Sequence, residues 1–157
     1  MNSIIKITKA SDIPEMVALS YIKRKNAEKT QPQFWRYASG AEETQAKWFE
    51  ELLARDDHIL LSSEQNNQIQ GFVIGRLVKA PEVYDPGGLT LMIDDFCVAD
   101  NKWDEIASSL ISEIKILAKE KGASQMLVVS GAWDITKKDF LYKIGLSVAS
   151  EWFVGGI

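Results

Sequence analysis

Apolar and polar residues recur with two different periods along this chain, and each period predicts one type of element. Strict alternation is typical of a half-buried strand, whereas apolar residues three or four positions apart are typical of a helix that buries one face. Ser11 and Pro14 mark a helix start, because serine caps free N–H groups and proline suits the first turn. In the first half of the chain these signals predict a strand at 4–8, a helix from 11 to about 25, a partly helical connection at 26–40 and a helix at 42–55.

The second half is more regular. Ile106, Leu110, Ile114 and Leu117 fall on one stripe and predict a long helix, which Gly122 ends. In chain order, the expected elements are a strand at 58–62, a turn at 66–67, a strand at 69–78, a loop at 81–88, a long strand at 89–98, the helix at 105–121, a short buried strand at 126–130, a helix capped by Asp134 and running to about 144, and a last strand at 147–154.

The order of these elements, β-α-α-β-β-β-α-β-α-β, predicts an α/β fold. A meander of strands followed by a β-α-β crossover gives a mixed sheet with helices on both faces. We find no linker or internal repeat, so residues 1–157 are expected to form a single domain. Ligands of open α/β sheets favour the carboxyl ends of the strands, which places the chemistry near residues 95–108, 130–134 and 142.

Composition narrows the function classes. Hydrophobic residues make up 46% and charged residues 25%, as in ordinary globular proteins. A net charge of −4 without a basic run gives no support for a nucleic-acid or anionic-membrane partner. One cysteine and one histidine predict no disulfide and no metal cluster built on these residues, which leaves a carboxylate site for magnesium or calcium as the open alternative. Neither a secretory leader nor a membrane span is visible, so a cytoplasmic protein is expected.

Three stretches resemble the GNAT superfamily of acyl-CoA-dependent N-acyltransferases. Met92-Ile93-Asp94-Asp95-Phe96-Cys97-Val98 is similar to the acidic strand of polyamine and related N-acetyltransferases. The long helix opening at Glu105-Ile106-Ala107 stands where that family places its pyrophosphate loop. Asp139-Phe140-Leu141-Tyr142-Lys143-Ile144-Gly145-Leu146 is close to a further family segment. The expected fold is therefore a single GNAT-like acyltransferase domain.

The resemblance implies acetyl-CoA as acyl donor and no metal. In the family the acidic strand lies alongside the pantetheine arm, and the following turn holds the pyrophosphate with main-chain N–H groups at a helix start. Carried over to this chain, the cofactor-binding residues are Phe96, Cys97, Val98, Lys102, Glu105, Ile106, Ala107 and Ser108.

The resemblance also implies catalytic residues. Tyr142 would protonate the departing thiolate, because a phenol stays protonated at neutral pH. Asp94 would assist deprotonation of the amine acceptor, with a water relay or a raised pKa making up for its weak basicity. Asp94 and Asp95 are adjacent on a strand and are therefore expected on opposite faces. Packing of the tyrosine and a solvated or salt-bridged aspartate pair are the structural alternatives.

Phe34, Trp35 and Tyr37 follow the first helix, the segment that the family uses to select its acceptor. They would bind a primary amine, either a cationic small molecule or a protein amine. Hydrophobic coverage of the core is the equal alternative. Cys97 is expected to be a core residue rather than a nucleophile, and His58 is expected to be structural.

One departure from the family pattern favours a second hypothesis. Glu105 stands where the pyrophosphate loop has a glycine, and the turn before it is one residue short. Asp104 and Glu105, acids at a helix start, would satisfy its free N–H groups themselves. The alternative is a GNAT-fold binding or regulatory module that no longer uses acetyl-CoA efficiently. Only one strand follows Gly145 where the family has two, and the edge left open favours a homodimer.

Overall fold

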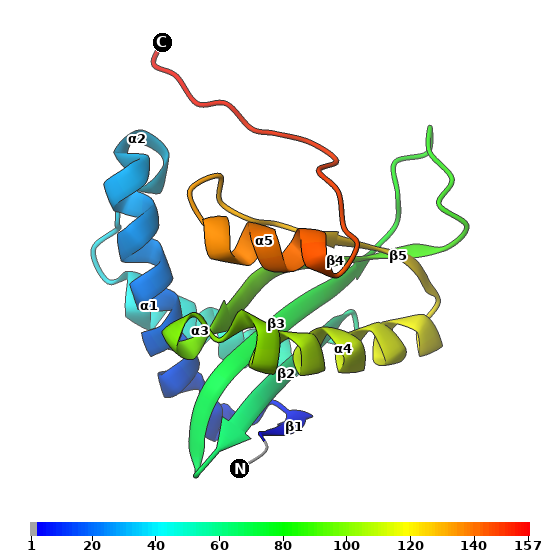
Figure 1. The fold of residues 1–157 in the computed structure, drawn as a ribbon, viewed down its shortest axis with the longest axis horizontal. Coiled ribbons are helices and arrows are strands. Elements are labelled where there is room, and N and C mark those ends of the chain that lie inside the picture. The colour runs from blue at the N-terminus through cyan, green and yellow to red at the C-terminus, as the bar shows by residue number, and fades with distance from the viewer. Residues whose placement is uncertain (1–2) are drawn as a thin grey trace.

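The computed structural model describes residues 3–157 as a mixed sheet with helices on both faces (Figure 1). The strands are β1 (Ile4–Ile7), β2 (His58–Gln65), β3 (Gln68–Val78), β4 (Leu89–Val98) and β5 (Ala123–Val128). The helices are α1 (Ile13–Thr30), α2 (Pro32–Trp35), α3 (Ala41–Leu53), α4 (Ser108–Glu120) and α5 (Ile135–Lys143), with 3₁₀ turns at Ala10–Asp12 and Ala99–Asn101 and a π-helical turn at Trp103–Ala107.

The sheet order β1-β2-β3-β4-β5 follows the chain. The first three pairings are antiparallel, and β4 and β5 are parallel because α4 connects them. Asn66 and Asn67 both have positive φ, at 53° and 59°, which is the conformation that a tight two-residue hairpin needs. The mixed sheet, the crossover and this turn confirm the expectations from the sequence.

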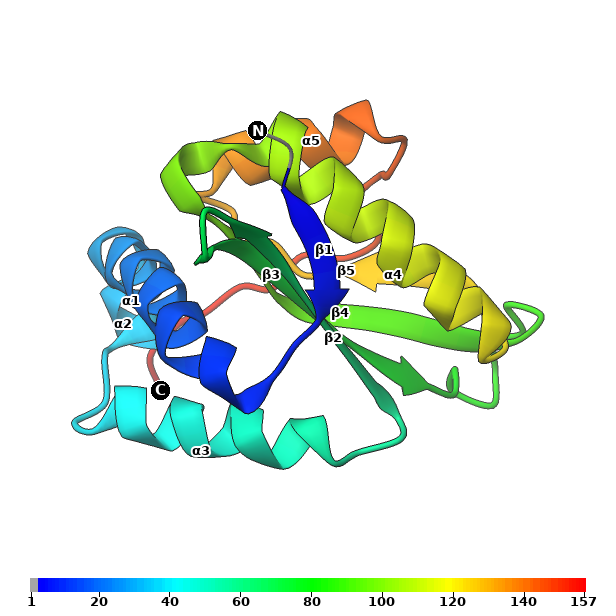
Figure 2. The same cartoon turned by 90° about the horizontal axis from the view of Figure 1, so that it is seen from below.

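Two separate hydrophobic clusters hold the helices to the sheet. One face carries α4 and α5, and the other carries α1 and α3, as Figure 2 shows. Ile114 of α4 and Phe140 of α5 belong to the first cluster, while Met16 of α1 and Phe49 of α3 belong to the second. The sheet thus has a buried residue set on each face, as a sheet between two helical layers requires.

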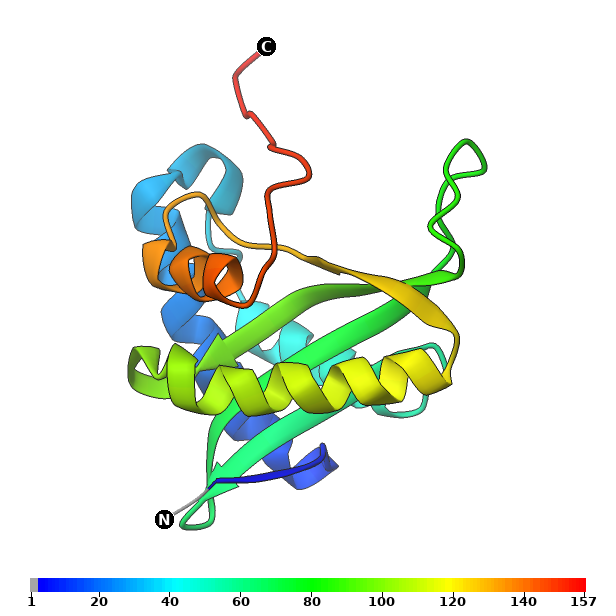
Figure 3. The same ribbon diagram turned by 45° about the vertical axis from the view of Figure 1, so that its right-hand side comes forward.

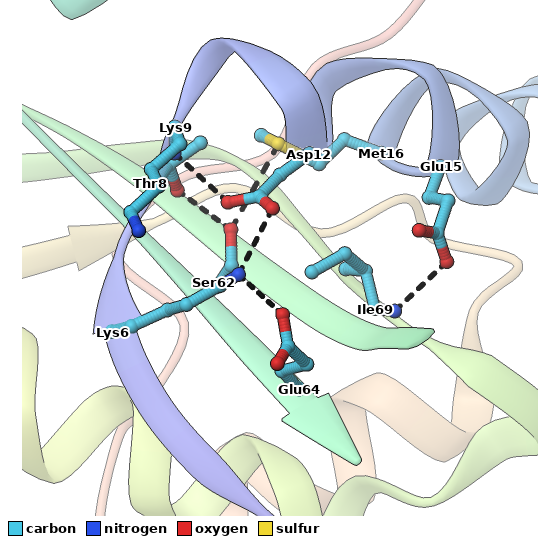
Figure 4. Close-up of polar contacts among 9 residues, drawn as sticks. All are labelled: Lys6, Thr8, Lys9, Asp12, Glu15, Met16, Ser62, Glu64 and Ile69. Carbon is cyan, nitrogen blue, oxygen red and sulfur yellow. Dashed lines mark hydrogen bonds and ion pairs between the residues drawn. The ribbon is translucent and has the colours of Figure 1, made fainter. Parts of the chain in front are cut away.

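A polar network joins β1, β2 and the start of α1 (Figure 4). Lys6 binds the carboxylates of Asp12 and Glu64. Asp12 is buried, and it also accepts a hydrogen bond of 2.8 Å from the backbone N–H of Lys9. The hydroxyls of Thr8 and Ser62 meet at 2.7 Å. Asp12, rather than the expected Ser11, therefore organises the start of this helix, and α1 begins at Ile13.

Several other boundaries differ from expectation. β2 continues to Gln65 rather than ending at 62, and α4 begins at Ser108 rather than at 105 because a π-helical turn precedes it. α1 continues to Thr30, five residues beyond the expected end at Lys25, because Ala27 also lies in the buried face. β5 begins at Ala123 and ends at Val128, rather than covering 126–130, because its ladder with β4 starts directly after the Gly122 turn.

The expected last strand at 147–154 is wrong. The structure has no strand after α5, and no backbone hydrogen bond joins 147–157 to the rest of the described chain. Gly145 ends α5 with a φ of 92°, and Figures 1 and 3 show the chain then running away from the sheet. Side-chain alternation alone does not make a strand, because a strand also needs a neighbouring edge to pair with. Within residues 3–157, none of the helices is both long enough and apolar enough to cross a membrane.

Candidate active site

The pairing between β4 and β5 ends halfway along β4. Their parallel ladder ends where Ile93 pairs with Val128, and the last bond across it runs from the Val129 N–H to the Ile93 carbonyl oxygen at 2.9 Å. β4 continues to Val98, paired on its other side with β3. The β5-facing edge of residues 94–98 therefore has no strand neighbour in the described chain, and we call the region between this edge and α5 the slot.

A β-bulge at Asp94 lies where the two strands diverge. Ile74 of β3 pairs with Asp95 and Gly75 pairs with Ile93, so Asp94 is the extra residue. A bulge twists and bends the strand that carries it. Ile93 and Phe96 are three residues apart, yet both belong to the cluster under α4 and α5. The bulge thus interrupts the simple alternation on which the expected opposite placement of the two aspartates was based.

Both aspartates stay near the strand surface. Asp94 is exposed and Asp95 is half-buried. The carboxylate of neither aspartate forms a hydrogen bond or ion pair within the described part of the chain. The salt-bridged pair that was one structural alternative is therefore not what the structure contains.

The turn after β4 gives the slot its second wall. Asp100 and Asn101 have positive φ values of 51° and 54°, which reverse the chain without any glycine. The π-helical turn Trp103–Ala107 then leads into α4, with Trp103, Ile106 and Ala107 buried. Gly71 on β3 permits this close approach, since a Cβ there would lie 2.8 Å from the Ile106 side chain.

The two acids of the turn do not cap the helix, contrary to expectation. No side-chain cap bond is present at this start. Asp104 instead accepts a 2.7 Å hydrogen bond from the Lys143 ammonium of α5. This pair borders a pocket of about 250 Å³ between the turn and α5, whose lining also includes Asn101, Trp103 and Thr136. The N–H of Ile106 in this turn already bonds the Lys102 carbonyl oxygen at 3.1 Å, so the pocket lies beside one paired and one exposed acid rather than beside fully free N–H groups.

α5 carries the candidate acid Tyr142 on its outer side. Asp134 caps the helix as expected, accepting from the Lys137 N–H at 3.1 Å. Phe140 and Leu141 are buried against the sheet, whereas Tyr142 is 51% exposed. The packing alternative for Tyr142 therefore receives no support from its environment.

Lys137 is the feature of the site that the sequence reasoning missed. Its side chain is only 1% exposed. Its ammonium lies 3.5 Å from the carbonyl oxygen of Phe96 and 5.6 and 5.7 Å from the ring centroids of Phe96 and Trp103. This lysine therefore occupies the slot beside β4.

Burial lowers the pKa of Lys137 to about 7, and the nearby charge of Lys23 adds to the effect. Electrostatic interactions with Cys97, Asp134 and Asp95 act to raise the same pKa, but they do not outweigh the effect of burial. A signal was present in the sequence, because Lys137 lies three and four residues before Phe140 and Leu141. It thus stands on the apolar stripe of α5, where a charged residue is out of place.

Cys97 and His58 are structural, as expected. Cys97 is buried in the cluster under α1 and α3, and burial raises the pKa of its thiol. His58 lies at the start of β2 with its Nδ1 2.7 Å from Asp57, which also binds Arg55. These partners lower the pKa of Asp57 to about 2. His58 borders an apolar hollow of about 270 Å³, none of whose lining residues belongs to the slot.

The aromatic residues after α1 gather at the far end of that helix. Phe34 and Trp35 are exposed on α2, with ring centroids 4.5 Å apart. Tyr37 packs edge-on against Tyr21, and its hydroxyl is buried without a hydrogen-bond partner in the described chain. Figures 1 and 3 show α2 and the end of α1 beside the loop that enters α5. Phe34 and Trp35 therefore do not cover the core, whereas Tyr37 does so in part.

Solved structures share this architecture over their whole length. A variant of the BH1408 protein from Bacillus halodurans aligns over 98% of this chain and 99% of its own, with a TM-score of 0.83 and 16% identity. A predicted acetyltransferase with acetyl-CoA from Clostridium acetobutylicum aligns over 98% and 96%, with a TM-score of 0.72 and 17% identity. The chain has the GNAT fold.

A ribosomal-protein-alanine N-acetyltransferase from Brucella melitensis shares the GNAT fold too, with a TM-score of 0.65, 18% identity and 99% of both chains aligned. No family model and no curated protein matches the sequence. At these identities the likeness concerns the fold, and the chemistry has to be argued from the site.

Proposed function

We propose that the protein is an N-acetyltransferase that moves acetyl from acetyl-CoA to a primary amine by direct attack. The observation that supports this most is the slot where β4 leaves β5 at Ile93. It leaves backbone groups of Phe96 and Val98 without a strand on that side, and such groups need partners. The structure of the predicted acetyltransferase from Clostridium acetobutylicum, which shares the fold, is with acetyl-CoA, and this supports acetyl-CoA as the ligand.

The residues around the slot fit this donor once Lys137 moves. Its single bond to the Phe96 carbonyl oxygen is long, at 3.5 Å, and its four-carbon side chain can swing out. The Phe96 and Val98 backbone would then bind the pantetheine amides, with Cys97 contributing main chain only, because its side chain is buried on the other face. When bound, acetyl-CoA supplies an acetyl group activated as a thioester.

The turn after β4 would hold the diphosphate. Ile106, Ala107 and Ser108 lie where the π-helical turn passes into α4, and Lys102 adds a positive charge beside them. The Ile106 N–H now bonds the Lys102 carbonyl oxygen at 3.1 Å and would exchange this bond for one to a phosphate oxygen. Glu105 is exposed and can point away from the anion. The Lys143 ammonium, now held by Asp104, borders the same pocket and can turn toward a phosphate.

Two side chains would move protons. The exposed Asp94 carboxylate at the bulge accepts a proton from the acceptor ammonium through water, which frees the amine for attack. The Tyr142 hydroxyl gives its proton to the departing sulfur. The acceptor itself would lie toward Phe34, Trp35 and Tyr37, where exposed aromatic rings favour a cation. The net charge of −4 favours the same substrate class.

Calorimetric titration and thermal shift with acetyl-CoA test the proposal. Binding at 100 times the Kd should stabilise the fold by about 2.7 kcal/mol. No stabilisation at millimolar acetyl-CoA would refute it. If binding occurs, Tyr142→Phe is expected to lower kcat about 10²-fold with little change in binding, with Tyr21→Phe as a matched control. An Asp94→Asn variant with unchanged kcat at every pH would remove Asp94 from the mechanism.

A non-catalytic GNAT-fold module remains the second candidate. Lys137 in the slot and Glu105 at the turn both favour it, because each opposes entry of the donor. Acetyl-CoA binding by the wild type and by Lys137→Ala together separates the two candidates. In an enzyme whose lysine is displaced by the donor, both proteins should bind acetyl-CoA. In a module with a permanently filled slot, the wild type should not bind, even if removal of the side chain in Lys137→Ala lets acetyl-CoA enter.

A further inference from the structure

Lys137 places an amine inside the slot that the proposed function gives to acetyl-CoA. Its side chain is 1% exposed, and its nitrogen lies 3.5 Å from the carbonyl oxygen of Phe96, one of the backbone groups proposed to bind the pantetheine arm. The donor and the lysine therefore compete for one position. Transfer to a separate acceptor uses Asp94 and Tyr142, so it leaves this amine without a role.

A purely structural role does not account for this lysine. It forms no ion pair with a carboxylate of the described chain, and its nearest aromatic neighbours are the rings of Phe96 and Trp103, at 5.6 and 5.7 Å. An amine buried in this way costs stability. Because burial lowers the pKa of Lys137 to about 7, about half of its amine is neutral at pH 7 and can act as a nucleophile.

We propose that Lys137 is itself an acetyl acceptor, modified by the acetyl-CoA that binds in the same slot. This inference rests on the proposed function, because the donor has to bind there. The nitrogen of the neutral amine attacks the carbonyl carbon of the thioester. An N–C bond forms, the C–S bond breaks, and the proton lost by the nitrogen goes to the departing sulfur, so CoA leaves as the thiol.

The backbone of α5 keeps the displaced amine close to the donor. Phe140 and Leu141, one turn further along the helix, are buried against the sheet and hold it in place. Entry of the pantetheine arm can therefore move the four-carbon side chain of Lys137 without moving the helix. Reacting groups held together in this way react much faster than the same groups free in solution. Lys138 lacks this advantage, because adjacent helical positions do not share a face.

Acetylation would also change what occupies the slot. The acetylated side chain is uncharged, so its burial no longer carries the cost of an ammonium. Its amide N–H can still donate to the Phe96 carbonyl oxygen, where the amine of Lys137 now lies. The modified lysine therefore favours the slot more than the free amine does, and it hinders binding of a second donor. The reaction is thus self-limiting.

Mass spectrometry of the protein incubated with acetyl-CoA, without any added acceptor, is the test. The intact mass should rise by one acetyl group, and peptide mapping should place this group on Lys137. Lys137 should react at least about 10-fold faster than Lys138 and than the exposed Lys115 of α4, because it lies beside the donor. Unfolding in urea should remove this difference. Excess CoA, which fills the slot without an acetyl group, should slow the reaction of Lys137 but not that of Lys115.

Calorimetric titration of the same protein with acetyl-CoA separates this inference from the proposed function. Binding without acetylation of Lys137 would overturn the inference and leave the proposed function standing, whereas absence of binding would refute both. Equal rates at the three lysines would show ordinary solution chemistry and would overturn the inference as well. A rate per chain that rises with protein concentration would do the same, because it would show transfer between copies. Lys137→Met is the control, and it should stay folded and lose the fast acetylation.

Discussion

Two lysines, one on the edge strand β1 and one beside β4 toward the other edge of the sheet, show how the surroundings of an amine decide its state. Lys6 lies between the carboxylates of Asp12 and Glu64 at the β1 edge (Figure 4), and the two bonds raise its pKa. Lys137 lies among aromatic rings beside β4 with one carbonyl oxygen in reach, and burial lowers its pKa to about 7. The first amine is part of the folding framework. Burial of the Lys137 amine costs stability, and groups with a pKa shifted in this way cluster at functional sites.

The largest expected effect on stability concerns the carboxylates that bind Lys6. Asp12→Ala should lower the free energy of unfolding by about 2–3 kcal/mol, because it removes the acceptor of both the Lys9 N–H and the Lys6 ammonium. Asp12→Asn keeps an acceptor for the N–H and should lose about half as much. Urea unfolding measures both; equal losses would show that the N–H bond contributes nothing.

The matched substitution at Lys137 should raise the free energy of unfolding instead of lowering it. Lys137→Met removes a buried amine without leaving a buried carboxylate behind, and it should raise the free energy of unfolding at pH 7 by about 1–2 kcal/mol. Lys6→Met, which leaves two carboxylates without a cation, should lower it. If both variants were destabilised alike, the contrast between the two lysines would be lost.

The difference in free energy of unfolding between Lys137→Met and the wild type should decrease as the pH rises above 7. The folded pKa of Lys137, about 7, lies below the unfolded value of 10.5, so the unfolded chain binds the extra proton between these values. This contribution of Lys137 to stability therefore rises with pH from about 7 to about 10.5. The advantage of Lys137→Met should shrink by about 1 kcal/mol between pH 7 and pH 8 in urea unfolding. A constant difference over that range would mean that Lys137 has an ordinary pKa.

The smallest effect on stability is expected at the surface pair beside the pocket. Asp104 and Lys143 are both 68% exposed, so Asp104→Asn should change the free energy of unfolding by less than about 0.5 kcal/mol. Its effect on acetyl-CoA affinity should be larger and favourable, because it removes a negative charge near the proposed diphosphate position. Glu50→Gln on α3, another exposed acid, is the control. Equal affinities for wild type and Asp104→Asn would place the diphosphate elsewhere.

Elements governed by local rules were predictable from the sequence. The α4 stripe, the turn at Asn66 and the cap at Asp134 were each expected and found, because short-range sterics and hydrogen bonds determine them. Residues 147–154 were expected to form a strand and do not, because pairing depends on which edge lies within reach. A local pattern contains no such information.

The same distinction between local and tertiary features applies to the candidate site. The acidic strand and the turn after it could be recognised from residue types, since both are continuous in sequence. The bulge at Asp94, the Lys143–Asp104 bond and the position of Lys137 depend on which elements meet across the fold. Lys137 could have been noticed as a charge on an apolar stripe, but its proximity to Phe96 could not.

The bulge at Asp94 makes the length of β4 as important as its composition. Removing that one residue would leave Ile93 opposite Gly75 and Asp95 opposite Ile74 in an unbroken ladder, so every other pairing would be kept while the bend that turns β4 away from β5 would be lost. Removing any other residue of β4 would shift part of the ladder by one position and turn buried side chains outward. A deletion at Asp94 would thus preserve the sheet and close the slot.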